Sequence, residues 1–388
     1  MKRPGRIVLF ASVIVFGLVL VLLILVKSTM GSGKPYLVVG TEPLFDGDAL
    51  EVVAELPLPP GNVAVSRTGR VFFNYHYLGS DGDAEGNTVF ELVDGVAQPY
   101  PDRAFQDVFR TTLGMLIDRQ NRLWVVDPAA IDGSRNTALY AFDLDTDELA
   151  FSFTFPDNDA DFAQDVQVTA DGRYVIAADT GLFGFIPPKL LVLDTETLDV
   201  RVVLEGHESV TTQPWRIRRQ DGSGVSVFWG LIDWQAGVDG ITISPDGRRL
   251  SYGAINHDTL YRVPLEALLD PDLNEPALAA LVEPVGTKPL SDGLSSDLDG
   301  NVYITDVENS TIARMTPDGE LVTLVRDPRI RWADGISFGP ENTVYFTDSA
   351  ISAYLTNTAD PPSREVLQEH APYHIFRFTN DIPGIPGS

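Results

Sequence analysis

The first hydrophobic feature of the chain is an unbroken run of apolar and small side chains from Ile7 to Val26. At 1.5 Å rise per residue, a helix of about 20 residues crosses a hydrocarbon core of about 30 Å. Three basic residues precede the run, namely Lys2, Arg3 and Arg6. Because cytoplasmic flanks carry the excess of Lys and Arg, this pattern keeps the N-terminus inside the cell. The run predicts a cytoplasmic tip and transmembrane anchor over residues 1–27, followed by a linker over 28–41.

The rest of the chain, residues 42–388, then lies outside the membrane of a single-pass cell-membrane protein, in the periplasm or extracellular space. A cleaved signal peptide, which would make the protein secreted, is the alternative. Such a peptide has an apolar region of roughly 7 to 15 residues and a small-residue cleavage site. The longer run here and its exit through Lys27-Ser28-Thr29-Met30 favour an uncleaved anchor.

Beyond the linker, one pattern of alternating apolar and polar residues recurs six times. Each copy has a short alternating strand, a tight turn, most often on Asp-Gly, and a second strand rich in Val, Tyr, Phe and Trp, which indicates a β-hairpin. The copies begin at Gly61, Leu113, Gln164, Asp239, Asp292 and Asp334. A second hairpin follows most copies, as in LYAFDLDTDEL from Leu139. Four strands per repeat predict an all-β protein, a six-bladed β-propeller preceded by one transmembrane helix.

Two segments depart from the regular repeat. The sixth copy lacks a fourth strand, whereas a spare strand starts at Ala49 before the first copy. We expect this N-terminal strand to complete the sixth blade, because closure removes an exposed sheet edge. A long insertion from about Gly206 to Val238 carries three tryptophans, Trp215, Trp229 and Trp234. It either lines a ligand pocket at the mouth of the channel or packs as a loop against the blades.

Composition narrows the chemistry. The absence of cysteine excludes disulfides, thiolate metal sites and a cysteine nucleophile. The formal net charge of −27 argues against nucleic acid as a partner. The five histidines show no metal-binding spacing such as H-E-x-x-H. His76 and His257 each lie just beyond a second strand, which would allow them to approach a common face, but we favour the alternative that each is a satisfied surface or loop histidine. The expected partners are a small-molecule ligand or substrate and, through the N-terminal helix, the membrane.

Acidic residues open several innermost strands, which line the central channel of a propeller. They form a ring with an amide, consisting of Gln164, Asp165, Asp239, Asp292 and Asp334. Like charges in a confined channel repel unless a cation or a proton compensates them. Oxygen ligands of this kind suit Ca²⁺ or another hard divalent cation. Alternatively, each Asp-Gly pair only accepts backbone hydrogen bonds and fixes a turn.

Several of these runs resemble known families. NRLWVVD from Asn121, VIAADTGLFGF from Val175 and DGITISPDGRRLSYGAINHDTLYRVP from Asp239 resemble the major royal jelly protein and yellow family. DGLSSDLDGNVYITD from Asp292 and DGISFGPENTVYFTD from Asp334 are equally similar to the broader six-bladed propellers that include gluconolactonase, senescence-marker and strictosidine-synthase-like proteins. The resemblance covers most of the predicted propeller.

The gluconolactonase resemblance implies a metal-dependent hydrolase of small lactones or esters. In those enzymes a channel ion is held by a Glu of the first blade, an Asn-Asp pair of the third, an Asn of the fourth and an Asp of the fifth. The matching positions here are Gly61, Gln164 with Asp165, Asp239 and Asp292, and Asp334 adds a carboxylate. The first-blade acid and both asparagines are therefore changed. The implied mechanism polarises the lactone carbonyl with the ion, while Asp292 or Asp165 activates water.

The royal jelly and yellow resemblance implies a different function. Members of that group are secreted proteins associated with pigment chemistry or with binding small amines. On this alternative the chain is a small-ligand-binding or dopachrome-type isomerising protein without hydrolase activity. Trp332 and Trp234 would line its pocket, and the acidic channel would attract a cationic ligand. A propeller that only presents loops to a protein partner is a third hypothesis.

Overall fold

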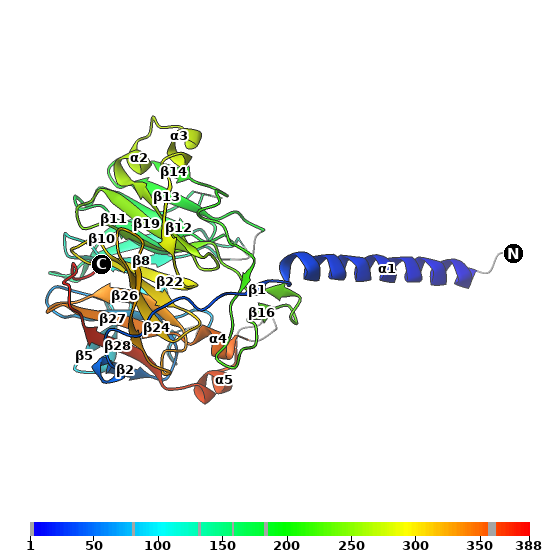
Figure 1. The fold of residues 1–388 in the computed structure, drawn as a ribbon, viewed down its shortest axis with the longest axis horizontal. Coiled ribbons are helices and arrows are strands. Elements are labelled where there is room, and N and C mark those ends of the chain that lie inside the picture. Colours follow the sequence, from blue (N-terminus) through cyan, green and yellow to red (C-terminus); the bar gives the residue numbers. More distant parts are fainter. Residues whose placement is uncertain (1–3, 80–81, 131–132, 157–158, 182–184, 356–361) are drawn as a thin grey trace.

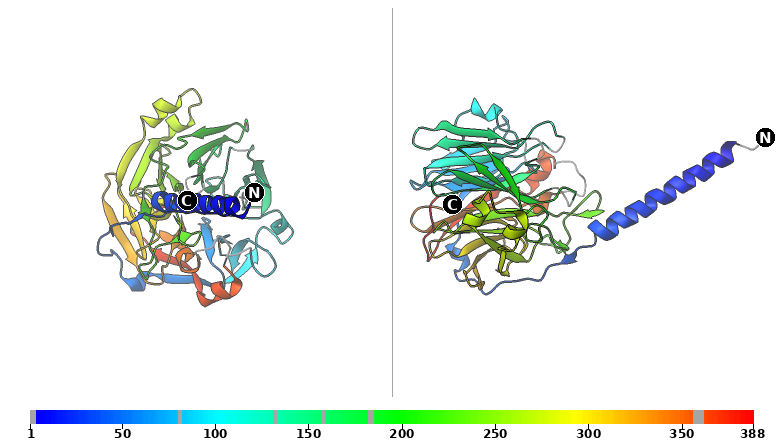
Figure 2. Two further views of the ribbon diagram at one scale, coloured as in Figure 1. Left: turned by 90° about the vertical axis from the view of Figure 1, so that its right-hand side faces the viewer. Right: turned by 90° about the horizontal axis from the view of Figure 1, so that it is seen from above.

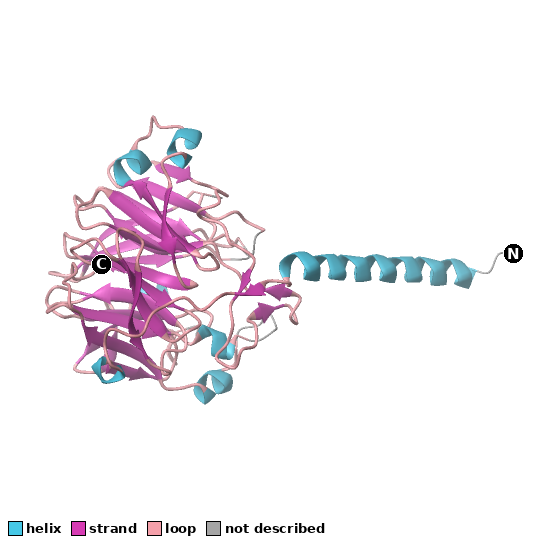
Figure 3. Cartoon of the chain, viewed as in Figure 1, coloured by secondary structure: helices cyan, strands magenta, loops and turns pink. Residues whose placement is uncertain are grey.

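The computed structural model describes residues 4–388 except 80–81, 131–132, 157–158, 182–184 and 356–361. Most of the strands form a ring of four-stranded antiparallel sheets, and the long helix α1 (Pro4–Met30) stands apart from the ring (Figures 1 and 3). The predicted six-bladed β-propeller with one N-terminal apolar helix is confirmed.

The first three blades follow each other along the chain, and each is a meander in which consecutive strands pair. Blade 1 consists of β3 (Pro60–Val65), β4 (Val71–Tyr75), β5 (Val89–Val93) and β6 (Val96–Pro99). Blade 2 consists of β7 (Met115–Ile117), β8 (Arg122–Asp127), β9 (Ala138–Asp143) and β10 (Glu148–Thr154). Blade 3 consists of β11 (Ala163–Val168), β12 (Tyr174–Asp179), β13 (Lys189–Asp194) and β14 (Val200–Val203).

The last three blades have the same order, but the sixth takes its outer strand from the N-terminal region. Blade 4 consists of β18 (Val238–Ile243), β19 (Arg249–Ala254), β20 (Thr259–Pro264) and β21 (Glu283–Thr287). Blade 5 consists of β22 (Ser291–Ser296), β23 (Val302–Asp306), β24 (Thr311–Met315) and β25 (Leu321–Arg326). Blade 6 consists of β26 (Ala333–Phe338), β27 (Thr343–Asp348), β28 (Tyr373–Thr379) and β2 (Glu51–Leu56). The pairing of β2 with β28 confirms the expected closure.

The innermost strands of neighbouring blades touch each other all round the ring, and they surround the channel. End-on, the colours run round the ring in chain order, with the N-terminal strand beside the C-terminal blade (Figure 2). The core lies between adjacent blades, where side chains such as Trp124, Tyr252 and Phe346 are fully buried. Both faces of most blade strands are buried, because each blade is covered by the neighbouring blades on its two sides.

The two ends of the ring differ. We call the end at which the innermost strands begin the upper end. The connections between the second and third strands of each blade lie there, and so does the segment between β14 and β18, which we call the insert (residues 204–237). The insert carries β15 (Trp215–Arg216), β16 (Ser226–Val227) and β17 (Ile232–Asp233). The chain beyond β28 lies at the lower end, where Gly387 pairs with Phe338, away from α1 (Figures 1 and 2).

Short elements decorate the ring. The strand β1 (Lys34–Pro35) pairs in parallel with β15. The helices are α2 (Leu265–Leu269), α3 (Glu275–Ala279), α4 (Ile351–Tyr354) and α5 (Arg364–Glu369), with 3₁₀ turns at η1 (Gly47–Ala49) and η2 (Phe105–Asp107). Within α1, the stretch Ser12–Met30 is long and apolar enough to cross a membrane, and its length and composition also fit a signal sequence.

Candidate functional site

A bulge at the start of the innermost strand aims side chains at the channel. In five blades the pairing between the first and second strands shifts register at this point. The shifts lie between Pro60 and Val63, Ala163 and Asp165, Val238 and Ile241, Ser291 and Leu294, and Ala333 and Ile336. A bulge inserts one extra residue and redirects the neighbouring side chain. The predicted ring residues sit in or beside these bulges.

A glycine follows three of the four ring aspartates, Asp239, Asp292 and Asp334, and allows neighbouring blades to approach closely. A Cβ on Gly240 would lie 2.3 Å from the carbonyl oxygen of Asp292, and one on Gly293 would lie 2.5 Å from that of Asp334. These contacts are too short for any side chain. The Asp-Gly pairs at the strand entries therefore serve the packing of one blade on the next, in addition to placing the acids.

The upper part of the channel holds a small cavity of about 20 Å³, which is room for about one water molecule or one bare cation. The residues with polar side chains that line it are Asn62, His76, Gln164, Asp165, Asp239, Asp292 and Asp334. The structure thus brings together all five ring residues identified in the sequence. It also adds Asn62 and His76. The interpretation of His76 and His257 as surface residues is wrong, because both side chains are buried.

Asp292 is the best-stabilised carboxylate in the cavity. The indole Nε1–H of Trp332 donates to its Oδ2 at 2.7 Å. Burial raises the pKa of Asp292 to about 6, and the hydrogen bonds from Trp332 and Asp239, with the nearby Lys288 charge, keep the rise small. Asp292 is therefore the group of this cluster that ionises most readily near neutral pH.

Asp165 is held by backbone donors. The N–H groups of Val166 and Ile241 donate to its two carboxyl oxygens at 2.8 and 3.2 Å. Burial raises the pKa of Asp165 to about 7, with a further contribution from the charge of Asp292. A carboxyl with a pKa near the ambient pH can both accept and release a proton.

Asp239 and Asp334 keep one buried oxygen each without a hydrogen-bond partner, Oδ2 in both cases. Burial first, and then the charge of Asp292, raise the pKa of both groups well above the usual carboxyl range. Among the described residues, no three acidic or histidine side chains are already arranged as a metal-binding group. The unpartnered oxygens instead mark where a proton or a cation would be accommodated.

His76 lies at the end of β4 and reaches the cavity from blade 1. The N–H of Leu78 donates to its Nδ1 at 3.2 Å, so the neutral ring carries its proton on Nε2, 3.9 Å from Oδ2 of Asp334. Burial lowers the pKa of His76 to about 3. The sequence signal for His76 is its position directly after the second strand of blade 1. The second strand of a blade ends at the upper end of the channel, where the first strand begins. His257 instead accepts the N–H of Thr259 through Nδ1 and lies outside this cavity.

A buried lysine lies beside the ring. The Nζ of Lys288 donates to the carbonyl oxygens of Ala254 and Pro289 and to Oγ of Ser291, at 2.8 to 3.2 Å. Burial lowers the pKa of Lys288 to about 7, and Asp258, Asp306 and Asp292 oppose that change. Lys288 was not identified from the sequence, because it precedes the fifth repeat and has no equivalent in the other repeats.

Trp332 and Trp234 form part of a roof over the channel. Their rings pack edge to face at 5.5 Å, and both side chains are buried. They belong to an apolar cluster that includes Tyr36, Val227 and Ile232, so the insert covers the upper end. Their predicted role in ligand binding remains a prediction.

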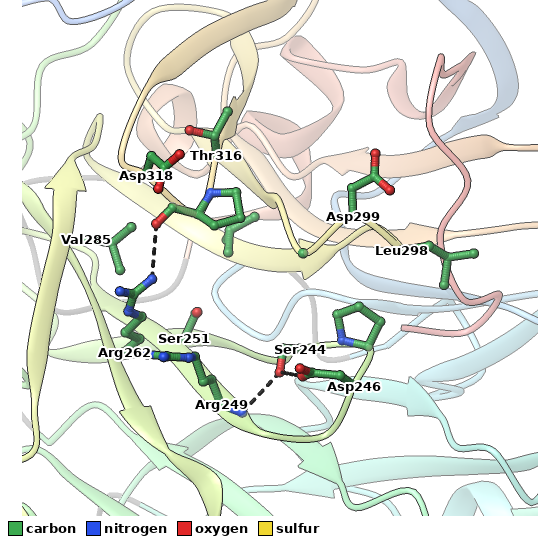
Figure 4. A pocket seen from close by; sticks show the side chains of 14 residues that line it. Ser244, Asp246, Arg249, Ser251, Arg262, Val285, Leu298, Asp299, Thr316 and Asp318 are labelled. Carbon is green, nitrogen blue, oxygen red and sulfur yellow. Dashed lines mark hydrogen bonds between the residues drawn. The ribbon is translucent and has the colours of Figure 1, made fainter.

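A larger cavity of about 370 Å³ lies at the lower end between blades 4 and 5 (Figure 4). Its two arginines, Arg249 and Arg262, both pair with Glu283, at 3.3 and 3.1 Å. Arg262 also donates to the carbonyl oxygen of Pro317. None of the residues predicted for the site lines this cavity.

Comparison with solved structures gives the fold. A putative gluconolactonase has a TM-score of 0.53 and 14% identity, with 87% of this chain and 93% of that chain covered. A gluconolactonase from Xanthomonas campestris has a TM-score of 0.53 and 12% identity, covering 86% and 89%. The calcium-binding protein regucalcin from Agrobacterium tumefaciens has a TM-score of 0.52 and 13% identity, with 89% of this chain and 97% of that chain covered. At these identities the likeness shows a shared propeller fold alone.

Comparison with families is more specific. No curated protein matches the sequence. The family model described as major royal jelly protein matches residues 110–364, from just before the second repeat to beyond the last. This range covers more than half of the chain. It includes all five ring residues and the whole of blades 3, 4 and 5. The chain therefore belongs to the major royal jelly protein family.

Proposed function

We propose that this protein is a membrane-anchored, extracytoplasmic propeller that binds a divalent cation, Ca²⁺ first, at its channel carboxylates and hydrolyses a small lactone or ester. The observation that carries the proposal is the pair of buried, unpartnered carboxyl oxygens of Asp239 and Asp334. Buried polar atoms of native proteins are nearly always satisfied. Two such oxygens beside a cavity large enough for one ion support the binding of a cation at this position.

The donor set suits a hard cation. Asp239, Asp292 and Asp334 would supply carboxylate oxygens, and Gln164 would supply an amide oxygen, since its Nε2 donates to Oγ1 of Thr180 at 3.2 Å. Oxygen ligands of this kind are typical of Ca²⁺ sites. When bound, the cation would polarise a substrate carbonyl and compensate the charge of the acids.

The protein's own residues supply the proton transfer. Asp165 takes a proton from water as the water oxygen bonds to the carbonyl carbon. It returns the proton to the ring oxygen as the carbon–oxygen bond of the lactone breaks. Its pKa of about 7 suits both steps. Asp292, whose pKa is about 6, is the second candidate for this role and is fixed by Trp332.

The test begins with thermal unfolding of the full chain in Ca²⁺ and in excess chelator. A cation that binds only the folded state at 100 times its dissociation constant adds about 2.7 kcal/mol of stability. We expect a higher midpoint with Ca²⁺, and no such rise in Asp239→Asn or Asp334→Asn. Asp246→Asn, at a hairpin tip, is the matched control and should keep the response. No response of the unmodified protein to any divalent cation would overturn the metal site.

A lactone and ester screen tests the chemistry. We expect hydrolysis by the calcium-loaded protein and its loss in Asp292→Ala. Hydrolysis that persists in that variant would contradict the proposed mechanism. A protein that binds Ca²⁺ but hydrolyses nothing would favour the second candidate function.

That second candidate is a small-ligand-binding or dopachrome-type isomerising protein, and one observation favours it. The aromatic rings of Trp234 and Trp332 pack together directly above the acids, where Trp332 donates to Asp292; the cavity below them holds about 20 Å³, so any organic ligand enters only if these rings move. A cationic ligand attracted by the acids would instead contact the aromatic pair Trp234 and Trp332. Binding of such a ligand to the protein, lost in Trp234→Ala, would support this function.

The anchoring and its orientation form part of the proposal. The apolar stretch of α1 and the charge pattern around it support an uncleaved span with the propeller outside the cell. Resistance of the membrane-bound chain to alkaline carbonate tests the span. A protein released into the medium without its first 26 residues would show that the segment is a signal peptide.

A further inference from the structure

The insert ends in an unusual hairpin tip. Its strands β16 and β17 pair Ser226 with Asp233 and Val227 with Ile232, and the tip between them is residues 228–231. The side chain of Trp229 is 81% exposed, more than any other large apolar side chain among the described residues. Phe228 and Trp229 both have left-handed φ angles, 51° and 58°, which bulky residues rarely adopt. The Trp229 indole thus points into solvent from a left-handed backbone conformation that glycine or asparagine would adopt more easily.

The tip is fastened to the end of α1. Lys27, the first charged residue after the apolar run, donates from Nζ to the carbonyl oxygen of Gly230 at 2.7 Å. Gly31 lies against the backbone of Leu231, where an added Cβ would be 2.2 Å from the carbonyl oxygen. The hairpin tip therefore lies at the level where the apolar run of α1 ends.

Further contacts fix this arrangement below the tip. The N–H of Gly33 donates to Oδ2 of Asp233 at 2.7 Å, and the guanidinium of Arg216 donates to the carbonyl oxygen of Gly33 at 2.6 Å. Val26 and Met30 pack against the apolar cluster of the insert. The last turn of α1 and the hairpin are thus one packed unit rather than two segments joined by a free linker.

We propose that the hairpin tip, residues 228–231, is embedded in the interface of the lipid bilayer that α1 spans, with the Trp229 indole among the lipid headgroups. Tryptophan prefers this region because its ring is apolar and its N–H remains able to donate a hydrogen bond. The proposal rests on the anchoring proposed above.

This contact orients the propeller. Trp234 follows the hairpin by a single residue and packs on Trp332, whose indole holds Asp292. The upper end of the channel therefore faces the membrane surface, and Figure 1 shows the insert between α1 and the blades. A ligand that approaches the carboxylates from this end therefore does so beside the lipid interface, where amphiphilic molecules with an apolar part concentrate.

The test uses the full chain in phosphatidylcholine proteoliposomes. Of the five tryptophans, Trp229 alone is strongly exposed. The fluorescence lost in Trp229→Phe therefore reports this residue, whose exposed position leaves the fold intact. As a matched control, Val96→Trp in the Trp229→Phe background places an indole at the lower end, at a side chain that is 61% exposed.

We expect the Trp229 fluorescence to be lost with lipids brominated near the headgroup end of their chains and to be protected from aqueous iodide. The indole at position 96 should show the reverse. Carbonate-resistant protein whose Trp229 fluorescence is lost to iodide and unaffected by brominated lipid would overturn the inference while leaving the anchor intact. Protein that carbonate removes from the vesicles would overturn the anchor and the inference together.

Discussion

At the scale of single residues, the channel depends on how four buried acids share charge and protons. The hydrogen bond from Trp332 and the charge of Lys288 favour ionised Asp292. That charge then raises the pKa of Asp239 and Asp334. The acids therefore titrate as a group, and a partner of any one of them influences the rest.

Replacing Trp332 by Phe removes the donor to Asp292 while keeping an aromatic ring. Partners that orient metal ligands are typically worth about 10- to 100-fold in metal affinity. We expect a loss of that order in Ca²⁺ affinity for Trp332→Phe, measured by isothermal titration calorimetry. Trp124→Phe is the matched control, because Trp124 is another buried indole that donates to an aspartate, Asp118, away from the channel. Equal losses in both variants would contradict the assignment.

The pH dependence of stability tests the raised pKa of Asp165. Because its pKa rises from 3.8 to about 7 on folding, the folded protein keeps a proton that the unfolded chain releases. This contribution is fully present below about pH 4 and is lost as the pH rises through about 7. His76 acts in the opposite sense, since its pKa falls to about 3 on folding.

A variant isolates the Asp165 contribution from the others. In excess chelator, Asp165→Asn should gain stability relative to the unmodified protein as the pH rises from about 4 to about 8. Thermal midpoints of both proteins across this range measure the difference. Asp171→Asn, at an exposed hairpin turn, should show no such gain. A difference that stays constant with pH would show that Asp165 titrates normally.

At the scale of elements, the innermost strands combine a bulge with a glycine contact. The alternating pattern predicted these strands, and the Asp-Gly pairs that open the innermost strands of blades 4, 5 and 6 were consistent with simple turns. The structure shows that Gly240 and Gly293 instead touch the backbone of the following blade. Sequence alone did not reveal this, because the partner lies in another blade and the contact requires the closed ring.

Gly240→Ala would place a methyl group against the carbonyl of Asp292. Overpacking of this kind typically costs about 1–3 kcal/mol, and we expect a loss in that range together with weaker Ca²⁺ binding. Urea unfolding measures the stability. Gly47→Ala is the control, because no atom lies within 4 Å of an added Cβ there, and its effect should be small. Equal stability of the two variants would contradict the close contact.

At the scale of the whole molecule, the ring is closed by a strand from its N-terminal side. β2 pairs only with β28 within its blade and buries Ala54 and Leu56. Without it, β28 would present an unpaired edge, which invites aggregation. The closure also couples the segment that follows the anchor to the last blade.

Two truncated forms test this closure. One begins at Gly47 and keeps β2, whereas the other begins at Leu58 and lacks it. Losing a buried leucine alone typically costs about 2–5 kcal/mol, so we expect the shorter form to unfold at a lower temperature and to aggregate. Thermal unfolding with light scattering measures both. The longer form is the matched control, because both lack α1 and its contacts. Equal midpoints would show that β2 is dispensable.

The sequence by itself determined the repeat, the number of blades, the closing strand and the apolar helix. These follow from local alternation, turn chemistry and length, which depend on neighbouring residues. It also identified the ring acids, because equivalent positions of a repeat meet at the axis.

Only the tertiary structure decided how those acids are satisfied and what covers them. Trp332 reaches Asp292 from the next blade, 40 residues away. His76 enters the cavity from blade 1, and Lys27 meets Gly230 across 203 residues. Such contacts leave no periodic signal in the sequence, because they arise between segments that only the closed ring brings together.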